Sequence, residues 1–175
     1  MITAIVPIKR ESQRVPNKNF KIINDKPLFY WIISTLNRSN FIDEIIINCD
    51  HPFVERTLFE YFDFLKFVFR PENLTGNEIS MNKIISSTLE HCKNESILQT
   101  HVTNPLLSIE TIDSALEKHI ENRTDYFSVT KLQERLYDKN GTAINHDINE
   151  LIDAFNQKVT IIQSVYHSFL RCKYE

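Results

Sequence analysis

Residues Ile5 to Asn19 read IVPIKRESQRVPNKN, and this stretch decides how the rest of the chain is interpreted. It begins inside a short apolar run, Ile2 to Ile8, which is typical of a buried strand, and then changes abruptly into a basic loop punctuated by proline. Open α/β sheets bind ligands at the carboxyl ends of their parallel strands, and a basic loop at that edge suits an anion. The stretch therefore predicts a first strand followed by a loop that binds a polyphosphate.

Positive charge is concentrated around this loop. Between Ile8 and Lys26 there are six basic and two acidic residues, a local net charge of +4 in a chain whose total is −3. The basic residues are Lys9, Arg10, Arg14, Lys18, Lys21 and Lys26. The remainder of the chain is acidic, which argues against a nucleic-acid-binding domain. We therefore expect a nucleoside triphosphate as ligand and no nucleic acid as partner.

Composition narrows the class of protein further. The 175 residues are 42% hydrophobic, enough for one sizeable core, and no run of 18 uncharged apolar residues occurs, so we expect a cytoplasmic protein without a membrane partner. The three cysteines are far apart in sequence and are expected to be reduced thiols. With only two glycines, Gly76 and Gly141, the chain has neither the dinucleotide-binding nor the Walker fingerprint.

Apolar runs of strand length alternate with segments of helical period along most of the chain. Strands are expected at 2–8, 42–49, 64–70, 96–101 and 125–130, and helices at 27–36, 51–62, 81–92 and 108–121. This alternation predicts an α/β fold with a doubly wound, mostly parallel sheet in a three-layer α/β/α domain. Beyond Gly141 the pattern weakens: a short helix is expected near 151–155, and residues 159–170 fit either a strand or a helix.

Two polar residues at strand ends have alternative interpretations. Asp50 follows the second strand, where a side chain can serve as a helix N-cap or as a metal ligand, and we favour the cap. His101 ends the fourth strand and fits a core histidine and a site residue equally well.

Several motifs resemble those of one enzyme family. After the first strand the chain reads Pro-x-Lys-x-x-Ser-x-Arg-Val-Pro-x-Lys-Asn from Pro7 to Asn19, followed by Lys26-Pro27-Leu28 at a helix start. Arg70-Pro71-Glu72-Asn73-Leu74 and Thr103-Asn104-Pro105-Leu106 follow the third and fourth strands. In this order the motifs resemble those of the acylneuraminate cytidylyltransferases, which make CMP-activated sialic acids and related 2-keto sugar acids. The resemblance extends from about Ile2 to Thr130 and implies a nucleotidyltransferase-type domain.

The resemblance implies a reaction and a cofactor. The anomeric hydroxyl of a sialic-acid-like 2-keto sugar acid would attack the α-phosphate of CTP, pyrophosphate would leave, and Mg²⁺ would assist, in the synthesis of surface glycan or lipopolysaccharide. Such a transfer needs cations placed where charge develops on phosphate oxygens, and Lys9, Arg14 and Lys18 would supply them. Lys9 and Lys18 are thus the expected catalytic residues.

The resemblance also assigns the binding residues. The expected nucleotide-binding residues are Lys9, Ser12, Arg14, Lys18, Asn19, Arg70 and Ser80, of which Asn19 would hold a ribose hydroxyl or a base edge. Thr103 and Asn104 would face the sugar acid together with a residue near the end of the fourth strand. That residue is His101 when counted back from Thr103 without a gap, or Gln99 when an insertion is allowed.

The chain departs from the family pattern in two places. Lys9-Arg10-Glu11 stands where the family has Arg-Gly-Gly, so the close backbone approach that glycine allows is either lost or replaced by Arg10. Family members are longer and have an arm that builds a homodimer, so we expect a cytidylyltransferase-like domain at 1–152, a divergent tail at 153–175 and an impaired dimer. Asp147 and Asp153 are available acids, but no motif places either at the metal, so the metal ligands are left open. A non-catalytic CTP-binding or interaction module is the alternative function.

Overall fold

A computed structural model describes residues 1–76, 78–132, 134–149, 160–163 and 169–172, and its contacts divide the chain into two compact units. Unit 1 comprises residues 1–127 and 168–175, and unit 2 comprises residues 128–167. The expected boundary between residues 152 and 153 and the expected helix at 151–155 lie outside the described residues. Among the described residues, no helix has both the length and the apolar character needed to cross a bilayer.

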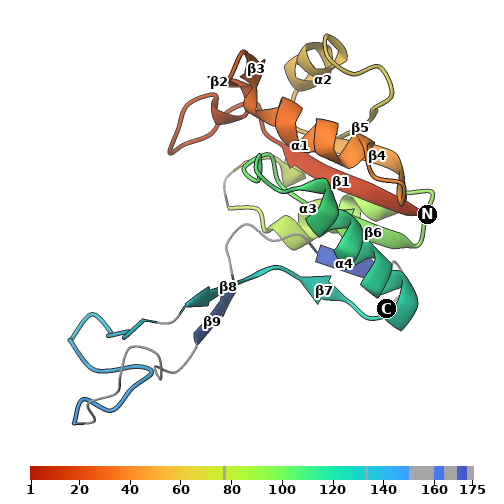
Figure 1. Cartoon of the computed structure of the whole chain (residues 1–175). Coiled ribbons are helices and arrows are strands. Elements are labelled where there is room, and N and C mark those ends of the chain that lie inside the picture. The colour runs from red at the N-terminus through yellow and green to blue at the C-terminus, as the bar shows by residue number, and fades with distance from the viewer. Residues whose placement is uncertain (77, 133, 150–159, 164–168, 173–175) are drawn as a thin grey trace. The chain divides into compact units, whose positions relative to one another are not determined.

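Unit 1 is built on a six-stranded sheet with the order β5-β4-β1-β6-β10-β7. Strands β1 (Ile2–Ile8), β4 (Ile42–Cys49), β5 (Lys66–Phe69) and β6 (Ser96–Gln99) are parallel neighbours. The last described strand, β10 (Phe169–Cys172), lies antiparallel between β6 and β7 (Tyr126–Phe127) and returns the blue end of the chain to the sheet (Figure 1). The α/β fold with a mostly parallel sheet is thus confirmed.

Four helices connect the strands of unit 1. They are α1 (Leu28–Asn37), α2 (Pro52–Phe59), α3 (Met81–Leu89) and α4 (Ile109–Asn122). Before α1 the chain forms a 3₁₀ turn, η1 (Lys18–Phe20), and a tight hairpin of β2 (Ile22–Ile23) and β3 (Lys26–Pro27). A second 3₁₀ turn, η2 (Glu72–Leu74), follows β5. Every expected helix in this range is present, with ends that differ by up to a few residues.

The core is divided by the sheet because successive strand residues point to opposite faces. In β1, Ala4, Val6 and Ile8 join the larger cluster, which includes apolar residues of α1, α2 and α4. Ile5 joins a smaller cluster with residues packed from α3, and both sets of β1 residues are fully buried. Burial on both faces explains why β1 reads as an uninterrupted apolar run.

Unit 2 contains a separate two-stranded sheet. Strand β8 (Val129–Leu132) pairs antiparallel with β9 (Thr160–Gln163), and an isolated bridge joins Tyr137 to Ala143. The single strand expected at 125–130 was wrong, because its two halves pair with different partners: β7 with β10 and β8 with β9. Strands were one of the two alternatives for residues 159–170, and the described parts of this segment are strands.

Candidate active site

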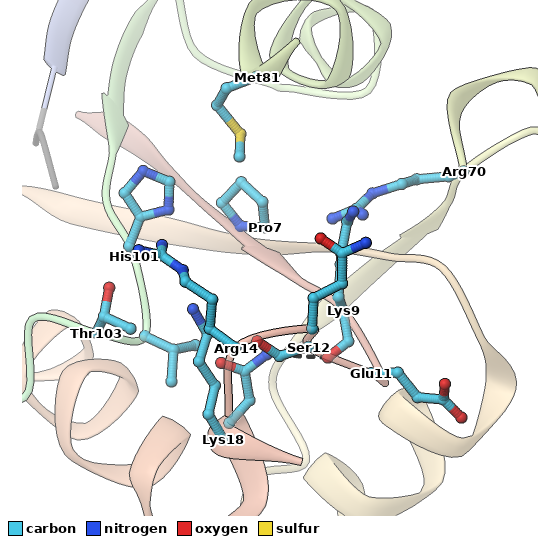
Figure 2. A pocket seen from close by; sticks show the side chains of 13 residues that line it. Pro7, Lys9, Glu11, Ser12, Arg14, Lys18, Arg70, Met81, His101 and Thr103 are labelled. Carbon is cyan, nitrogen blue, oxygen red and sulfur yellow. Dashed lines mark hydrogen bonds between the residues drawn. The ribbon is translucent and has the colours of Figure 1, made fainter. Parts of the chain in front are cut away.

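A cleft with a volume of about 240 Å³ opens at the carboxyl ends of β1 and β6. Thirteen residues line it: Pro7, Lys9, Glu11, Ser12, Gln13, Arg14, Lys18, Asn19, Arg70, Met81, His101, Val102 and Thr103. Four of them are basic and one is acidic, so the lining favours an anion. Figure 2 shows the basic side chains of Arg14, Lys18 and Lys9 converging on the space between His101 and Arg70, whereas the Glu11 carboxylate points away from them.

The basic loop after β1 is held in shape by Asn19. Asn17 adopts the left-handed conformation (φ 52°), which turns the chain into η1 and places Asn19 inward, where it is buried. There the Asn19 side-chain nitrogen donates a 2.9 Å hydrogen bond to the backbone carbonyl of Lys9. This bond ties the end of the loop to its beginning, so Asn19 has a structural task besides its expected contact with ribose or base.

Arg70 follows β5 and reaches the cleft from inside the protein. Its Nε donates to Oδ1 of Asn48, and its Nη2 donates to the Asn48 carbonyl at 3.0 Å and to the Ile8 carbonyl at 3.4 Å. The remaining nitrogen, Nη1, is buried and has no hydrogen-bond partner among the described residues. An unpaired buried donor costs about 1–3 kcal/mol, and a ligand oxygen in the cleft would recover that cost.

Lys9 lies beside Arg70 and carries a charge that its surroundings disfavour. Burial lowers the pKa of the Lys9 ammonium, the Arg70 and Lys18 charges lower it further, and the Asp50 carboxylate opposes them. Its Nζ donates to the carbonyl of Gly76, in the loop before α3. A phosphate would supply the negative charge that the cleft lacks, so the arrangement favours an anionic ligand.

The neighbouring Arg10 does not line the cleft. Its backbone N–H donates to Asp50 Oδ1 at 2.8 Å, and its guanidinium approaches the His51 ring (Nη1 to Nε2, 3.1 Å) and the face of Phe53. Arg10 thus fastens the loop to the start of α2. The expectation that Asp50 caps α2 was wrong: Asp50 accepts the Arg10 N–H instead, and Nδ1 of His51 accepts from the Phe53 N–H and forms the cap.

The loop after β6 forms the wall opposite Arg70. His101 and Thr103 line the cleft. Gln99 is buried in β6, and its Nε2 contacts Nε2 of His101 at 3.0 Å. Gln99 Nε2 also donates to the Thr100 carbonyl, which can only accept; this identifies the nitrogen end of the amide and makes His101 Nε2 the acceptor. Asn104 donates to the Thr100 hydroxyl at 3.4 Å. The alignment without a gap selects His101, which lines the cleft. The alignment with an insertion selects Gln99, which does not line it.

A family model for cytidylyltransferases matches residues 3–171. The chain belongs to the cytidylyltransferase family. The match continues past Thr130, where the motif-based resemblance ends, and includes β9 and all of β10 except Cys172. His101, which the alignment without a gap selects, lines the same cleft as the polar residues of the basic-loop motif. The family motifs and the geometry therefore point to the same site.

Two curated relatives are pseudaminic acid cytidylyltransferases from Campylobacter jejuni, one from serotype O:2 and one from serotype O:23/36. Each is 27% identical over 135 residues, which is 74% of this chain and 58% of the relative. The chain therefore spans little more than half the length of these cytidylyltransferases.

Solved structures share the fold at low identity. A CMP:2-keto-3-deoxy-manno-octonic acid synthetase complexed with CTP superposes with a TM-score of 0.71 at 12% identity, over 98% of this chain and 74% of that chain. The 4-diphosphocytidyl-2C-methyl-D-erythritol synthase from Anaerococcus prevotii gives 0.63 at 14% identity, over 98% and 70% of the two chains. The bifunctional IspDF from Campylobacter jejuni gives 0.67 at 12%, over 98% and 41%.

The cleft brings together most of the expected site residues. Eight expected residues line it: Lys9, Ser12, Arg14, Lys18, Asn19, Arg70, His101 and Thr103. Three others do not: Ser80, Gln99 and Asn104. Ser80 is exposed at the N-cap position of α3, where its side chain makes no capping bond, and its neighbour Met81 lines the cleft instead. Gln13, Met81 and Val102 were not expected from the sequence, although each of the three adjoins an expected site residue.

The Mg²⁺ that the family resemblance implies finds few protein ligands here. Mg²⁺ at phosphate sites usually binds one or two carboxylates together with substrate phosphates. In the described part of the chain, no three His, Cys, Asp or Glu side chains are grouped as a metal site. The one carboxylate lining the cleft, Glu11, points away from the basic residues (Figure 2). Asp147 belongs to unit 2 and Asp153 lies outside the described residues. The ligands of such an ion therefore stay unassigned among the described residues.

Proposed function

We propose that this chain transfers a cytidylyl group from CTP to the anomeric hydroxyl of a 2-keto sugar acid of the pseudaminic or sialic acid type, giving a CMP-sugar and pyrophosphate. The observation that carries the proposal is the buried Nη1 of Arg70, which has no partner among the described residues, together with the cleft that Arg70, Lys9, Arg14 and Lys18 line. The unpaired nitrogen is costly without a ligand, and the four cations are complementary to a nucleoside triphosphate. Membership of the cytidylyltransferase family makes CTP the triphosphate of choice.

The residues divide by the part of the substrate that they face. In the reaction the anomeric oxygen forms a bond to the α-phosphorus, the bond from that phosphorus to the bridging oxygen breaks, and the hydroxyl proton is released. Lys9, Arg14 and Lys18 offset the charge that develops on the leaving pyrophosphate, and Ser12 adds a hydroxyl donor. Asn19 and Arg70 serve the cytidine, and His101 and Thr103 serve the sugar acid.

Several further statements belong to the same proposal. Mg²⁺ is proposed as the counter-ion of the triphosphate, with ligands that are left open. Homodimerisation, implied by the family resemblance, is tested by light scattering on the purified chain. The cytoplasmic location and the role in surface glycan or lipopolysaccharide synthesis remain predictions.

Release of pyrophosphate tests the activity. Purified protein is incubated with CTP, Mg²⁺ and, in separate reactions, pseudaminic acid, N-acetylneuraminic acid and 2-keto-3-deoxy-manno-octonic acid. We expect pyrophosphate with at least one acid, and none without an acid or with the Lys18→Ala variant. Lys21→Ala is the matched control, because Lys21 is a neighbouring lysine that does not line the cleft. Pyrophosphate in no reaction would contradict the proposed activity.

A second candidate is a CTP-binding module without catalysis. The observation that favours it is coverage: the match extends over 58% of each curated relative, so the likeness in sequence concerns only part of those enzymes. This candidate predicts CTP binding without turnover on any of the three acids.

A further inference from the structure

Arg70 is held by a chain of polar groups that lies entirely inside the protein. Asn48 on β4 and Thr88 on α3 are both fully buried, and Arg70 is 7% exposed. The Thr88 hydroxyl donates to the Ile84 carbonyl at 2.9 Å, and the Asn48 side-chain nitrogen donates to the Thr88 oxygen at 2.8 Å. Oδ1 of Asn48 then accepts from Arg70 Nε. A helix, a strand and the cleft are therefore joined by three consecutive hydrogen bonds.

The direction of every bond in this chain is determined. The Ile84 carbonyl can only accept, so the Thr88 hydroxyl must donate to it and present a lone pair to Asn48. That lone pair selects the nitrogen end of the Asn48 amide, which leaves the oxygen end for Arg70. Without the hydroxyl, only the Arg70 Nε–H, which needs an acceptor, would still select the oxygen end of the Asn48 amide.

The bonds leave one end of the guanidinium for a ligand. Asn48 engages Nε with its side-chain oxygen and Nη2 with its carbonyl oxygen, and Ile8 accepts a second bond from Nη2. Nη1 is the only one of the three nitrogens without a partner among the described residues, and Arg70 lines the cleft. Burial of polar atoms is costly unless they are hydrogen-bonded, and these bonds offset that cost for Nε and Nη2.

We infer that Thr88 and Asn48 are positioning residues, which fix the Arg70 guanidinium so that Nη1 meets an acceptor oxygen on the nucleoside part of the substrate. The inference rests on the proposed function for the identity of the ligand, but the positioning itself does not. Thr88 sets the orientation of Asn48, and Asn48 sets the orientation of Arg70. Neither residue lines the cleft, so both act only through the arginine.

The positioning is tested without any ligand, by NMR of the Arg70 Nε–H. Its resonance is assigned by its loss in Arg70→Lys, and we expect slow exchange with solvent in the wild type. Thr88→Val should accelerate this exchange at least about tenfold, because the bond to Asn48 is weakened. Thr88→Ser keeps the hydroxyl and should behave as wild type. Unchanged protection of the Nε–H in folded Thr88→Val would overturn the inference.

The matched control is Thr3→Val. Thr3 is also fully buried, and its hydroxyl donates to Glu44 at 2.7 Å, but it lies at the amino end of β1, away from the cleft. Thr3→Val should lower the melting temperature as Thr88→Val does and leave the Arg70 resonance unchanged. An equal effect of both variants on that resonance would mean that general destabilisation, and not positioning, is the cause.

Titrations show what Arg70 is positioned for. Thr88→Val should raise the Kd for CTP about tenfold and the Kd for pyrophosphate less than twofold, since the nucleoside side alone loses a contact. Equal losses for both ligands would overturn the assignment of Nη1 to the nucleoside. If wild-type protein binds no CTP, the proposed function fails, while the NMR result still decides the positioning.

A double variant covers the case in which Thr88→Val does not fold. Asn48→Asp presents an oxygen to Arg70 Nε in either orientation of its side chain and no longer needs Thr88 to select one. We therefore expect Thr88→Val/Asn48→Asp to restore protection of the Nε–H and a CTP affinity within about threefold of wild type. Failure of a folded double variant to restore protection would contradict the role given to Thr88.

Discussion

The charged side chains at the two ends of the central sheet differ in how they are paired within the protein. At the amino ends of β1 and β4, Glu44 accepts from the Thr3 hydroxyl, the Lys66 ammonium and the Lys93 N–H, and Asp43 pairs with Lys93 at 2.8 Å. At the carboxyl ends, Arg70 has one nitrogen without a partner among the described residues, and burial and neighbouring cations lower the pKa of Lys9. The first end pairs its charges within the protein, whereas the second gathers cations around a cleft.

This difference separates stability from function on one scaffold. Groups that are satisfied within the protein stabilise the fold, whereas groups that lack a partner destabilise it until a ligand binds. Substitutions at the amino end should therefore change stability and leave CTP affinity unchanged. Substitutions in the cleft should do the reverse.

The largest expected effect is on triphosphate binding at the cleft. Lys18→Ala should raise the Kd for CTP about 10- to 100-fold and the Kd for CMP less than threefold, because only the outer phosphates lose a charged donor. Its melting temperature should stay within about 2 °C of wild type. Calorimetric titration with both nucleotides checks this, with Lys21→Ala as control. An equal loss of affinity for CTP and CMP would contradict the assignment of Lys18 to the outer phosphates.

A substitution at the opposite end should have the opposite result. Glu44→Gln weakens an acceptor that serves three donors and should cost about 2 kcal/mol of unfolding free energy, which lowers the melting temperature by about 4–8 °C. CTP affinity should be unchanged. Thermal unfolding followed by circular dichroism, combined with titration, measures both quantities. A folded Glu44→Gln protein with reduced CTP affinity would show that the two ends are coupled.

The pH dependence of stability should also depend on the carboxylates at the amino ends of the strands, Asp43 and Glu44. Hydrogen bonds from Lys93 and other donors outweigh burial and lower the pKa values of Asp43 and Glu44 in the folded protein. A lowered carboxyl pKa gives stability that is present above the unfolded value and is lost as pH falls through the folded value. The stability difference between wild type and Asp43→Asn/Glu44→Gln should thus be largest near pH 6 and shrink below about pH 4. Urea unfolding between pH 3 and pH 7, analysed for both proteins, measures it. A difference that grows toward low pH would contradict the assignment.

The smallest expected effect is an uptake of protons when CTP binds. A lowered pKa leaves part of Lys9 neutral in the free protein below its ordinary value of 10.5, and a bound phosphate would restore the proton. Titrations near pH 9 in buffers of different ionisation enthalpy should therefore reveal uptake of a fraction of a proton. Lys9→Met should abolish the uptake, and wild-type uptake that persists in this variant would assign it to another group.

The sequence predicted the parts of the molecule whose signals are local. The apolar runs of β1 and β4 are long and uninterrupted, and both strands have the expected bounds. The basic loop carries its cleft-lining residues within 11 positions of one another, from Lys9 to Asn19, so a motif was enough to group them.

Features that depend on distant partners were not predicted. Asp50 and His51 can both cap a helix. The choice between them depends on Arg10, which is 40 residues earlier in the sequence and donates its backbone N–H to Asp50. Asn48 is hidden in the apolar run of β4, and its partner Thr88 is on a helix 40 residues later. The place of β10 between β6 and β7 likewise has no local signal, because a short apolar segment fits a strand or a helix equally well.

The central claim is that the basic cleft at the carboxyl ends of β1 and β6 is a site for CTP. Calorimetric titration of the purified chain with CTP in the presence of Mg²⁺, compared with UTP and ATP, tests it most directly. The account predicts saturable binding of CTP with a Kd at least about tenfold lower than for either competitor. Folded protein that binds none of the three, or binds all three equally, would contradict it.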